Sequence, residues 1–247
     1  MAKILHTADF HLDSAFTALP EEKARLRRQE ARQLTDRLVD YATRFGLGEK
    51  TGIELTERSG VMASREYTES LGQKWYDGNT LSVAIGQENS AFTPIQLANY
   101  IATLVNGGTR YSTHLLKEVK ASNFTSVEYS YQPQVLSTID IQPKNLEAVK
   151  AGMLALTSDG SVSRYFQNLG VKVGAKTGSA QISAQTESNA VFVCYAPYDD
   201  PQIAISIAVE KGGSGSSLAS IAAEILQYYF TAQDGQGQIP AENTLVP

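Results

Sequence analysis

A lysine, a threonine, a glycine and a serine follow one another at residues 176–179, in a segment that reads as a β-strand. On an exposed strand, Lys176 would supply positive charge, Thr177 a hydroxyl hydrogen bond and Gly178 a flat surface. Together these three contributions suit a carboxylate ligand. The segment therefore predicts a site that recognises a carboxylate.

Two features of the surrounding sequence bear on this prediction. Gly174 and Ala175 precede the motif, and such small residues would let a ligand or a neighbouring backbone approach closely. The tripeptide Lys-Thr-Gly alone has little specificity, since it also occurs at residues 50–52. An ordinary edge strand with a solvated lysine is therefore the alternative interpretation.

Three predicted strands and one helix would position the motif. The strands are residues 171–178, 190–195 and 203–210, and a turn at 199–202 joins the last two. The helix covers residues 217–230, and one of its faces is apolar. This pattern predicts an α+β fold, in which an antiparallel sheet has flanking helices and a C-terminal helix packed on one face.

Further helices are predicted upstream. Thr93 is expected to cap a helix that begins at Pro94 and ends at the Asn-Gly-Gly segment of residues 106–108. Another helix is expected at residues 143–156.

The N-terminal region carries a long charged helix, predicted at about residues 20–42. A strand at residues 4–8 and a short extended piece at residues 53–55 complete the predicted elements. One face of the helix is moderately apolar, and its members are Leu26, Leu34, Leu38 and Tyr41.

The composition is that of an ordinary globular protein. The 247 residues are 42% hydrophobic and 19% charged, which excludes a disordered or fibrous chain. The formal net charge of −5 argues against a nucleic-acid partner, because binding to phosphates requires a surplus of lysine and arginine.

The only cysteine, Cys194, lies in the apolar run of residues 191–195, which predicts a buried structural thiol. One cysteine cannot form an internal disulfide or a multi-cysteine metal site. The sequence has no secretory signal at its start and no apolar run long enough to span a membrane. As written, the chain is therefore expected in the cytoplasm.

Five segments occur in an order that resembles the class B penicillin-binding proteins. They are FGLGEKTGIEL at residues 45–55, AIGQ at 84–87, FTPIQLA at 92–98, NGG at 106–108 and KTGSAQ at 176–181. The resemblance covers about residues 42–230. It implies part of a serine β-lactamase/transpeptidase-like fold, and a reaction that cross-links peptidoglycan stem peptides through an acyl-serine intermediate.

This resemblance assigns roles to four residues of the strand motif. Lys176 would support proton transfer and balance charge, and Thr177 would bind the carboxylate of a stem peptide or of penicillin. Gly178 would contact the substrate, and the backbone at Ser179 would help to form the oxyanion hole. The resemblance implies no cofactor and no metal ion.

The sequence departs from the family pattern at the nucleophile. No serine has lysine three residues later, and none has asparagine two residues later, so the Ser-x-x-Lys and Ser-x-Asn motifs are absent. Ser64, Ser179 and Ser183 are poor replacements because no lysine is paired with them. We therefore expect no catalysis, and at most weak binding of stem peptides or β-lactams. A noncatalytic interaction module is the alternative.

A second resemblance concerns the first 40 residues. KILHTADFHLDS at residues 3–14 resembles the start of calcineurin-like metallophosphoesterases of the DNA-repair exonuclease branch, with Asp9 and His11 at the first metal-ligand motif. The remaining ligands of a two-metal site are missing, because only His114 follows His11 and no Gly-Asn-His motif exists. We therefore expect no metal site here.

The two resemblances together predict three parts. Residues 1–42 would be a strand and helix from one family, and residues 43–230 a truncated transpeptidase domain, with a seam between about residues 33 and 43. Residues 231–247 would be a disordered tail.

The truncation also predicts an exposed sheet edge beside the strand of residues 203–210, because the first strands of the resembled fold are missing. The predicted strand and helix of residues 1–42 are candidates to cover it. The sequence leaves the oligomeric state open.

Overall fold

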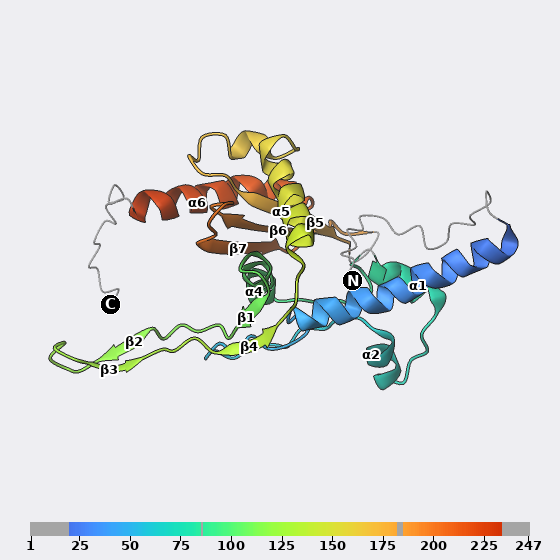
Figure 1. Cartoon of the computed structure of the whole chain (residues 1–247), viewed down its shortest axis with the longest axis horizontal. Coiled ribbons are helices and arrows are strands. Elements are labelled where there is room, and N and C mark those ends of the chain that lie inside the picture. Colours follow the sequence, from blue (N-terminus) through green and yellow to red (C-terminus); the bar gives the residue numbers. More distant parts are fainter. Residues whose placement is uncertain (1–19, 85, 182–184, 234–247) are drawn as a thin grey trace. The chain divides into compact units, whose positions relative to one another are not determined.

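The computed structural model describes residues 20–84, 86–181 and 185–233 (Figure 1). The chain forms two compact units, Met1–Lys150 and Ala151–Pro247. The predicted strand at residues 4–8 lies outside the described residues. Of the helices that the structure describes, none combines the length and the apolar character needed to cross a membrane.

Four helices belong to the first unit: α1 (Glu21–Arg44), α2 (Arg65–Ser70), α3 (Asp77–Ala84) and α4 (Pro94–Val105). Helix α1 confirms the prediction of a long N-terminal helix. The predicted apolar face is wrong at its start, because the Leu26 side chain is 56% exposed.

Helix α4 shows how its sequence specifies both of its ends. The hydroxyl oxygen of Thr93 accepts a hydrogen bond from the Gln96 N–H, and the Gln96 side chain accepts one from the Thr93 N–H. This reciprocal arrangement is a capping box. At the other end Asn106 is the C-cap, and its side-chain oxygen accepts hydrogen bonds from the N–H groups of Gly108 and Thr109. The predicted start and stop are both confirmed.

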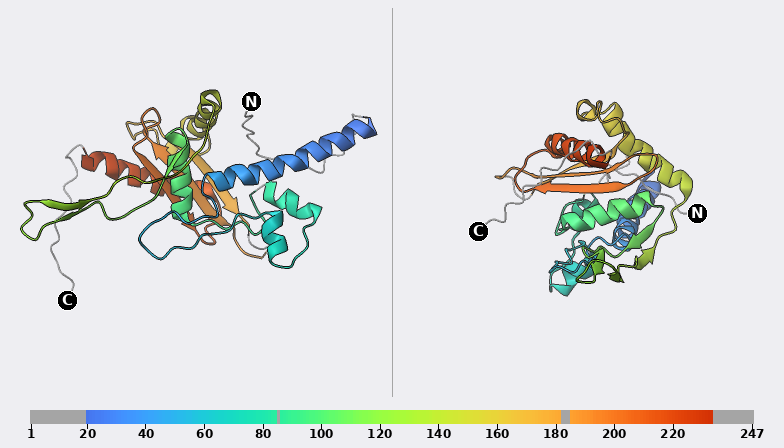
Figure 2. Two further views of the ribbon diagram at one scale, coloured as in Figure 1. Left: turned by 60° about the horizontal axis from the view of Figure 1, so that its bottom comes forward. Right: turned by 90° about the vertical axis from the view of Figure 1, so that its left-hand side faces the viewer.

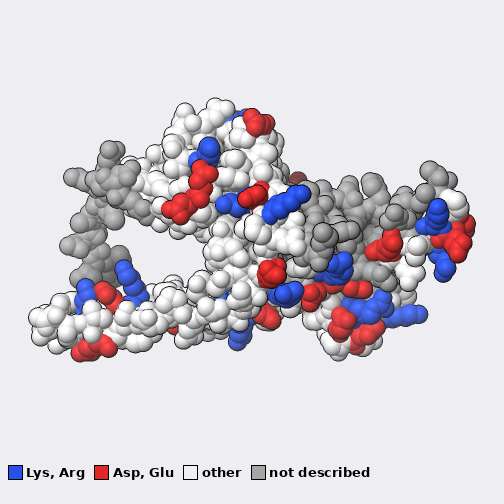
Figure 3. All heavy atoms as spheres, in the orientation of Figure 1, with Lys and Arg blue, Asp and Glu red and all other residues white. Residues whose placement is uncertain are grey.

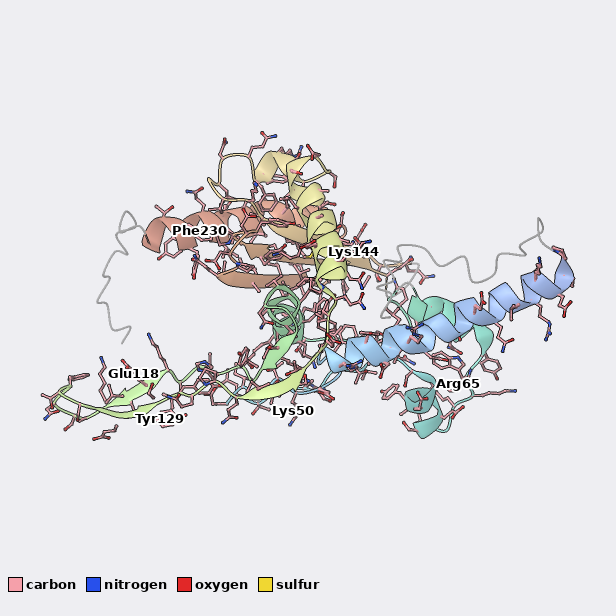
Figure 4. The ribbon with its side chains drawn as sticks, viewed as in Figure 1. Lys50, Arg65, Glu118, Tyr129, Lys144 and Phe230 are labelled. Atoms are coloured by element: carbon pink, nitrogen blue, oxygen red, sulfur yellow. The ribbon has the colours of Figure 1, made fainter. Side chains whose placement is uncertain are left out.

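A long antiparallel ribbon, which the sequence analysis did not predict, follows α4. It consists of β1 (Thr109–Tyr111), β2 (Glu118–Lys120), β3 (Val127–Ser130) and β4 (Val135–Thr138), with β1 paired to β4 and β2 to β3. Residues of β2 and β3 are exposed throughout, and Figure 4 labels one residue of each, Glu118 and Tyr129. The predicted extended piece at residues 53–55 is wrong, because this segment is a bend between loops.

The second unit contains the predicted three-stranded sheet. Its strands β5 (Gly174–Ala180), β6 (Asn189–Ala196) and β7 (Ile203–Val209) are antiparallel, and β6 lies in the centre. Helix α5 (Pro143–Ser158) crosses the boundary between the units, and the short helix η1 (Ser163–Tyr165) follows it.

The chain closes with η2 (Gly215–Leu218) and α6 (Ala219–Gln233), which packs on one face of the sheet (Figure 2). Helix α6 includes the first three residues of the predicted tail, 231–233, and residues 234–247 lie outside the described residues.

The core of the second unit lies between this helix and the sheet. Phe192 and Cys194 of β6 are fully buried, as are Ala222 and Leu226 of α6. Alternate residues of a strand point to one face, so β6 presents Phe192 and Cys194 to the helix. Burial raises the pKa of the Cys194 thiol to about 12. Cys194 is therefore a structural residue, as predicted.

Candidate carboxylate-binding strand

The predicted carboxylate-binding motif lies on β5, which is an edge strand of the sheet. Lys176 is opposite Val193 of β6, and Gly178 is opposite Val191. Among the described residues, β5 pairs with no strand other than β6. An edge strand presents a row of backbone N–H and C=O groups to which an extended peptide can bind. The location on an exposed strand agrees with the prediction.

Lys176 is the charged group of this edge. Its side chain is exposed, and its Nζ donates a hydrogen bond to the carbonyl oxygen of Thr177, at 2.7 Å. Within the described part of the chain, Lys176 forms no ion pair with a carboxylate. Its positive charge is therefore available to an anionic ligand.

Ser179 connects the motif to the loop before α6. Its Oγ accepts a hydrogen bond from the Gly215 N–H at 3.1 Å, and a Cβ at position 215 would overlap the carbonyl oxygen of Gly178. The backbone at Gly215 therefore rests directly on the motif. Sequence reasoning missed this role of the Ser179 hydroxyl group, since it considered only the backbone at that residue.

The two glycines of β5 have different surroundings. A Cβ at Gly174 would overlap the ring of Tyr195, whereas a Cβ at Gly178 would make ordinary contact with Val191. The close approach predicted at Gly174 is therefore made by a neighbouring side chain. At Gly178 the packing would tolerate a Cβ, so the absence of a side chain there is not required by the fold and leaves a flat surface on the strand.

The other Lys-Thr-Gly copy, at residues 50–52, lies in a loop and already holds a carboxylate. The N–H groups of Thr51 and Gly52 donate to the two oxygens of Glu57, at 3.0 and 2.8 Å, and the Thr51 hydroxyl adds a third hydrogen bond. Desolvation raises the pKa of Glu57, but these hydrogen bonds outweigh it, and the pKa lies below its ordinary value. In this copy of the tripeptide, the position of a carboxylate ligand is occupied by the side chain of Glu57.

Buried polar groups hold this loop in place. Arg110 of β1 is buried, and its guanidinium donates to the Glu49 carboxylate at 2.5 Å and to the Lys50 carbonyl at 3.1 Å. Gln96 donates from its amide to the carbonyl oxygens of Glu49 and Ser59. Two of the segments that resemble penicillin-binding proteins, residues 45–55 and 92–98, are therefore hydrogen-bonded to each other through Gln96 and Glu49.

The serines considered as replacement nucleophiles have other roles where the structure describes them. The Ser64 Oγ accepts the Tyr67 N–H at the start of α2, at 3.1 Å, and Ser179 binds Gly215. Ser183 lies outside the described residues.

Asp9 and His11 also lie outside the described residues. In the part that the structure describes, no group of three or more His, Cys, Asp or Glu side chains could hold a metal ion. Figure 3 shows acidic and basic side chains interspersed on its visible face, without a continuous basic patch.

The antiparallel sheet with its Lys-Thr-Gly edge strand and C-terminal helix matches the fold of penicillin-binding transpeptidases. Solved structures agree with this class. The chain is similar to Pseudomonas aeruginosa PBP2 in complex with WCK 5153, with 31% identity and a TM-score of 0.65 over 81% of this chain and 44% of that chain. Helicobacter pylori PBP2 in complex with MreC matches at 25% identity and a TM-score of 0.63, over 81% and 36%.

The family model for the penicillin-binding protein transpeptidase domain matches residues 26–227, and the chain belongs to this family. Peptidoglycan D,D-transpeptidase MrdA of Escherichia coli K12 is 32% identical over 85% of this chain and 36% of its own length. Penicillin-binding protein 2A of Bacillus subtilis is 34% identical, over 82% and 30%. The chain spans about a third of the length of these relatives. The resemblance to penicillin-binding proteins and the predicted fold class are confirmed.

Proposed function

We propose that this chain provides the carboxylate-binding strand of a peptidoglycan D,D-transpeptidase. The observation that supports this most directly is Lys176, exposed and without a carboxylate partner among the described residues, on the free edge of β5. Two relatives, one named for this activity and one for binding penicillin, are 32% and 34% identical to the chain over the aligned residues. A stem peptide would add to the edge as an extended strand, with its terminal carboxylate near Lys176 and Thr177.

The chemical step requires more than this strand. In the family reaction a serine hydroxyl attacks the peptide carbonyl, the C–N bond breaks, the terminal amino acid leaves and an acyl-serine forms. Backbone N–H groups near Ser179 would stabilise the oxyanion. The 247 residues contain no Ser-x-x-Lys motif. We therefore propose that this chain alone binds such ligands weakly and does not form the acyl-serine.

Binding can be tested by titrating the chain with N-acetyl-D-alanyl-D-alanine while following backbone amide signals by NMR. We expect shifts at residues 176–179 that disappear in Lys176→Met. The matched control is Lys50→Met, which changes an exposed lysine of the same tripeptide in the loop filled by Glu57 (Figure 4). Equal shifts in wild type and Lys176→Met would refute the proposed site.

Acylation can be tested separately, by incubating the chain with benzylpenicillin and recording its intact mass. An unchanged mass is expected. A stoichiometric adduct would show that a serine is activated, and peptide mapping would identify that serine. This result would contradict the proposed lack of acylation while leaving the binding site as a separate question.

We also propose that the residues ahead of the family match, up to about residue 25, have a separate origin and hold no metal. The support is the resemblance of residues 3–14 to metallophosphoesterases and the absence of the other ligands of that family from the sequence. The transpeptidase match begins at residue 26, before the predicted seam at about residues 33–43, so the separate origin is proposed only for the residues ahead of the match. Calorimetric titration with Mn²⁺ should give no heat of specific binding, and tight stoichiometric binding would contradict the proposal.

A second candidate function is a noncatalytic interaction module. Among the described residues β7 has only β6 as a paired strand, so one side of this strand can accept a partner.

A further inference from the structure

The ribbon of the first unit is interrupted between its two ladders. The inner ladder, β1 with β4, continues through a hydrogen bond from the Ser112 N–H to the Gln134 carbonyl oxygen, at 2.8 Å. The outer ladder, β2 with β3, begins with a hydrogen bond from the Tyr131 N–H to the Lys117 carbonyl oxygen, also at 2.8 Å. We call residues 117–131 the outer ribbon.

The two sides of the interruption cannot pair with each other in a regular ladder. One side, residues 113–116, has four residues, whereas the other side, residues 132–133, has only two. Pro133 also has no N–H group to donate. We call these six residues the joint. The N–H groups of its longer side therefore need acceptors from another part of the chain.

A neighbouring loop supplies these acceptors. The Thr51 carbonyl oxygen accepts the Thr113 N–H at 2.9 Å. The two carboxylate oxygens of Glu54 accept the N–H groups of Leu115 and Leu116, at 2.8 and 3.3 Å. Hydrogen bonds from its own N–H and from Leu115 and Leu116 lower the pKa of the Glu54 carboxyl group, so the acceptor at neutral pH is the charged form. The Glu54 side chain thus takes the place of a paired strand along the joint.

An aromatic stack links the two sides of the joint. The His114 ring lies on the Tyr131 ring, with ring centroids 3.4 Å apart and an angle of 13° between the planes. The Tyr131 hydroxyl donates to the Ser112 carbonyl oxygen at 3.3 Å, and the His114 Nδ1 lies 3.1 Å from the Leu116 carbonyl oxygen. The stack therefore connects the start of the outer ribbon with the end of the inner ladder.

The joint is also the main support of the outer ribbon within this chain. In the part of the chain that the structure describes, no hydrogen bond or ion pair joins β2 or β3 to a residue outside the outer ribbon. A two-stranded ribbon is only marginally stable by itself in water. The contacts of the joint are therefore the ones that can set the direction of the outer ribbon.

We propose that Glu54 is a positioning residue, whose carboxylate, together with the His114–Tyr131 stack, holds the outer ribbon in one direction. Loss of these contacts lets the outer ribbon pivot about the joint, because a few loop residues can absorb the change in backbone angles. All of these residues lie in the first unit, so this inference is independent of the function proposed for β5.

Residual dipolar couplings of backbone amides test the direction of the outer ribbon. In the wild-type chain the couplings of β2 and β3 should fit the same molecular alignment as those of α4, which belongs to the same unit. In Glu54→Ala the couplings of β2 and β3 should fall towards zero, because a pivoting element averages them. Couplings of α4 should not change, which shows that the unit is still folded. Unchanged couplings in β2 and β3, or a separate alignment in wild type, would overturn the proposal.

Two further variants make this test specific. Glu54→Gln keeps one acceptor oxygen, so it should reduce the couplings less, and it tests the proposal even if Glu54→Ala unfolds. Glu128→Ala is the matched control, since it removes an exposed carboxylate of β3 and should leave the couplings unchanged. An equal reduction in Glu128→Ala and Glu54→Ala would contradict a specific role of Glu54.

The stack can be tested with a pair of substitutions at Tyr131. Tyr131→Phe keeps an aromatic ring on His114 and should keep the couplings of β2 and β3, whereas Tyr131→Leu removes the stack and should reduce them. Equal couplings in the two variants would contradict the role of the stack.

Amide exchange followed by NMR tests the two hydrogen bonds of Glu54 directly. The amides of Leu115 and Leu116 should exchange at least about tenfold faster in Glu54→Ala than in wild type, while those of β6 exchange at the same rate in both. If the exchange of Leu115 and Leu116 is not accelerated, Glu54 does not hold the joint and the proposal is wrong.

Discussion

At the scale of single residues, two glycines of the same strand should respond differently to the same change. Gly174→Ala would force a Cβ into the ring of Tyr195, which is fully buried, so we expect a loss of about 1–3 kcal/mol in the free energy of unfolding. Gly178→Ala should cost much less, because its Cβ would only contact Val191. Urea unfolding of both variants checks this, and equal losses would contradict the packing described for Gly174.

Glu57 should make stability depend on pH. Its carboxylate has a lowered pKa in the folded chain, despite the opposing effect of desolvation, because Thr51 and Gly52 donate hydrogen bonds to the charged form. A lowered pKa stabilises the fold above the ordinary glutamate pKa of about 4.3, and this contribution is lost as pH falls through the folded-state value.

Glu57→Gln should therefore lower the free energy of unfolding at pH 7 by about 1 kcal/mol and reduce its fall on acidification. Urea titrations between neutral and acidic pH measure both effects. Glu69→Gln, at an exposed position of α2, is the matched control. If both variants lose stability equally with acid, the Glu57 interaction does not cause the dependence.

At the scale of elements, Gln96 joins the start of α4 to two loops. Gln96→Ala would leave the Thr93 N–H and the carbonyl oxygens of Glu49 and Ser59 without this partner, so we expect a loss of about 3 kcal/mol. Thr93→Ala removes only one side of the cap and should cost about 1 kcal/mol. Thermal unfolding of the two variants should show the larger decrease for Gln96→Ala, and the reverse order would contradict this view of the helix start.

Elements with strong local signals were predictable from the sequence. The capping threonine and the following proline define the start of α4, and the alternating apolar residues of β7 identify that strand. The ribbon formed by β1 to β4 was missed because its strands have only three or four residues. Bulges interrupt both of its ladders, and exposure of β2 and β3 removes the alternation between buried and exposed residues.

The sequence was sufficient to predict where the candidate site lies, but it predicted only some of the contacts that its residues make. Local residue types placed the Lys-Thr-Gly motif on a strand. The hydrogen bond between Ser179 and Gly215 joins residues 36 apart, and the contact of Gly174 with Tyr195 depends on the register between two strands. Neither is encoded by a local pattern. The glycines around Ser214 were the one signal of a close backbone approach there.

At the scale of the whole molecule, protection from hydrogen exchange should differ strongly between segments. The central strand β6 is buried along most of its length, whereas every residue of β2 and β3 is exposed. Amides of β6 should therefore exchange at least about tenfold more slowly than those of β2 and β3. Exchange followed by mass spectrometry measures this, and similar rates in the two regions would mean that the ribbon is stabilised by further contacts.

The filled Lys-Thr-Gly loop offers a way to calibrate the strand motif. If Glu57 were shortened to alanine, the N–H groups of Thr51 and Gly52 would be left to receive a small free acid such as acetate. The acetate concentration that restores stability would then report how strongly this tripeptide, held in its loop conformation, attracts a carboxylate. That value would provide an internal reference against which ligand capture at Lys176 can be compared within the same polypeptide.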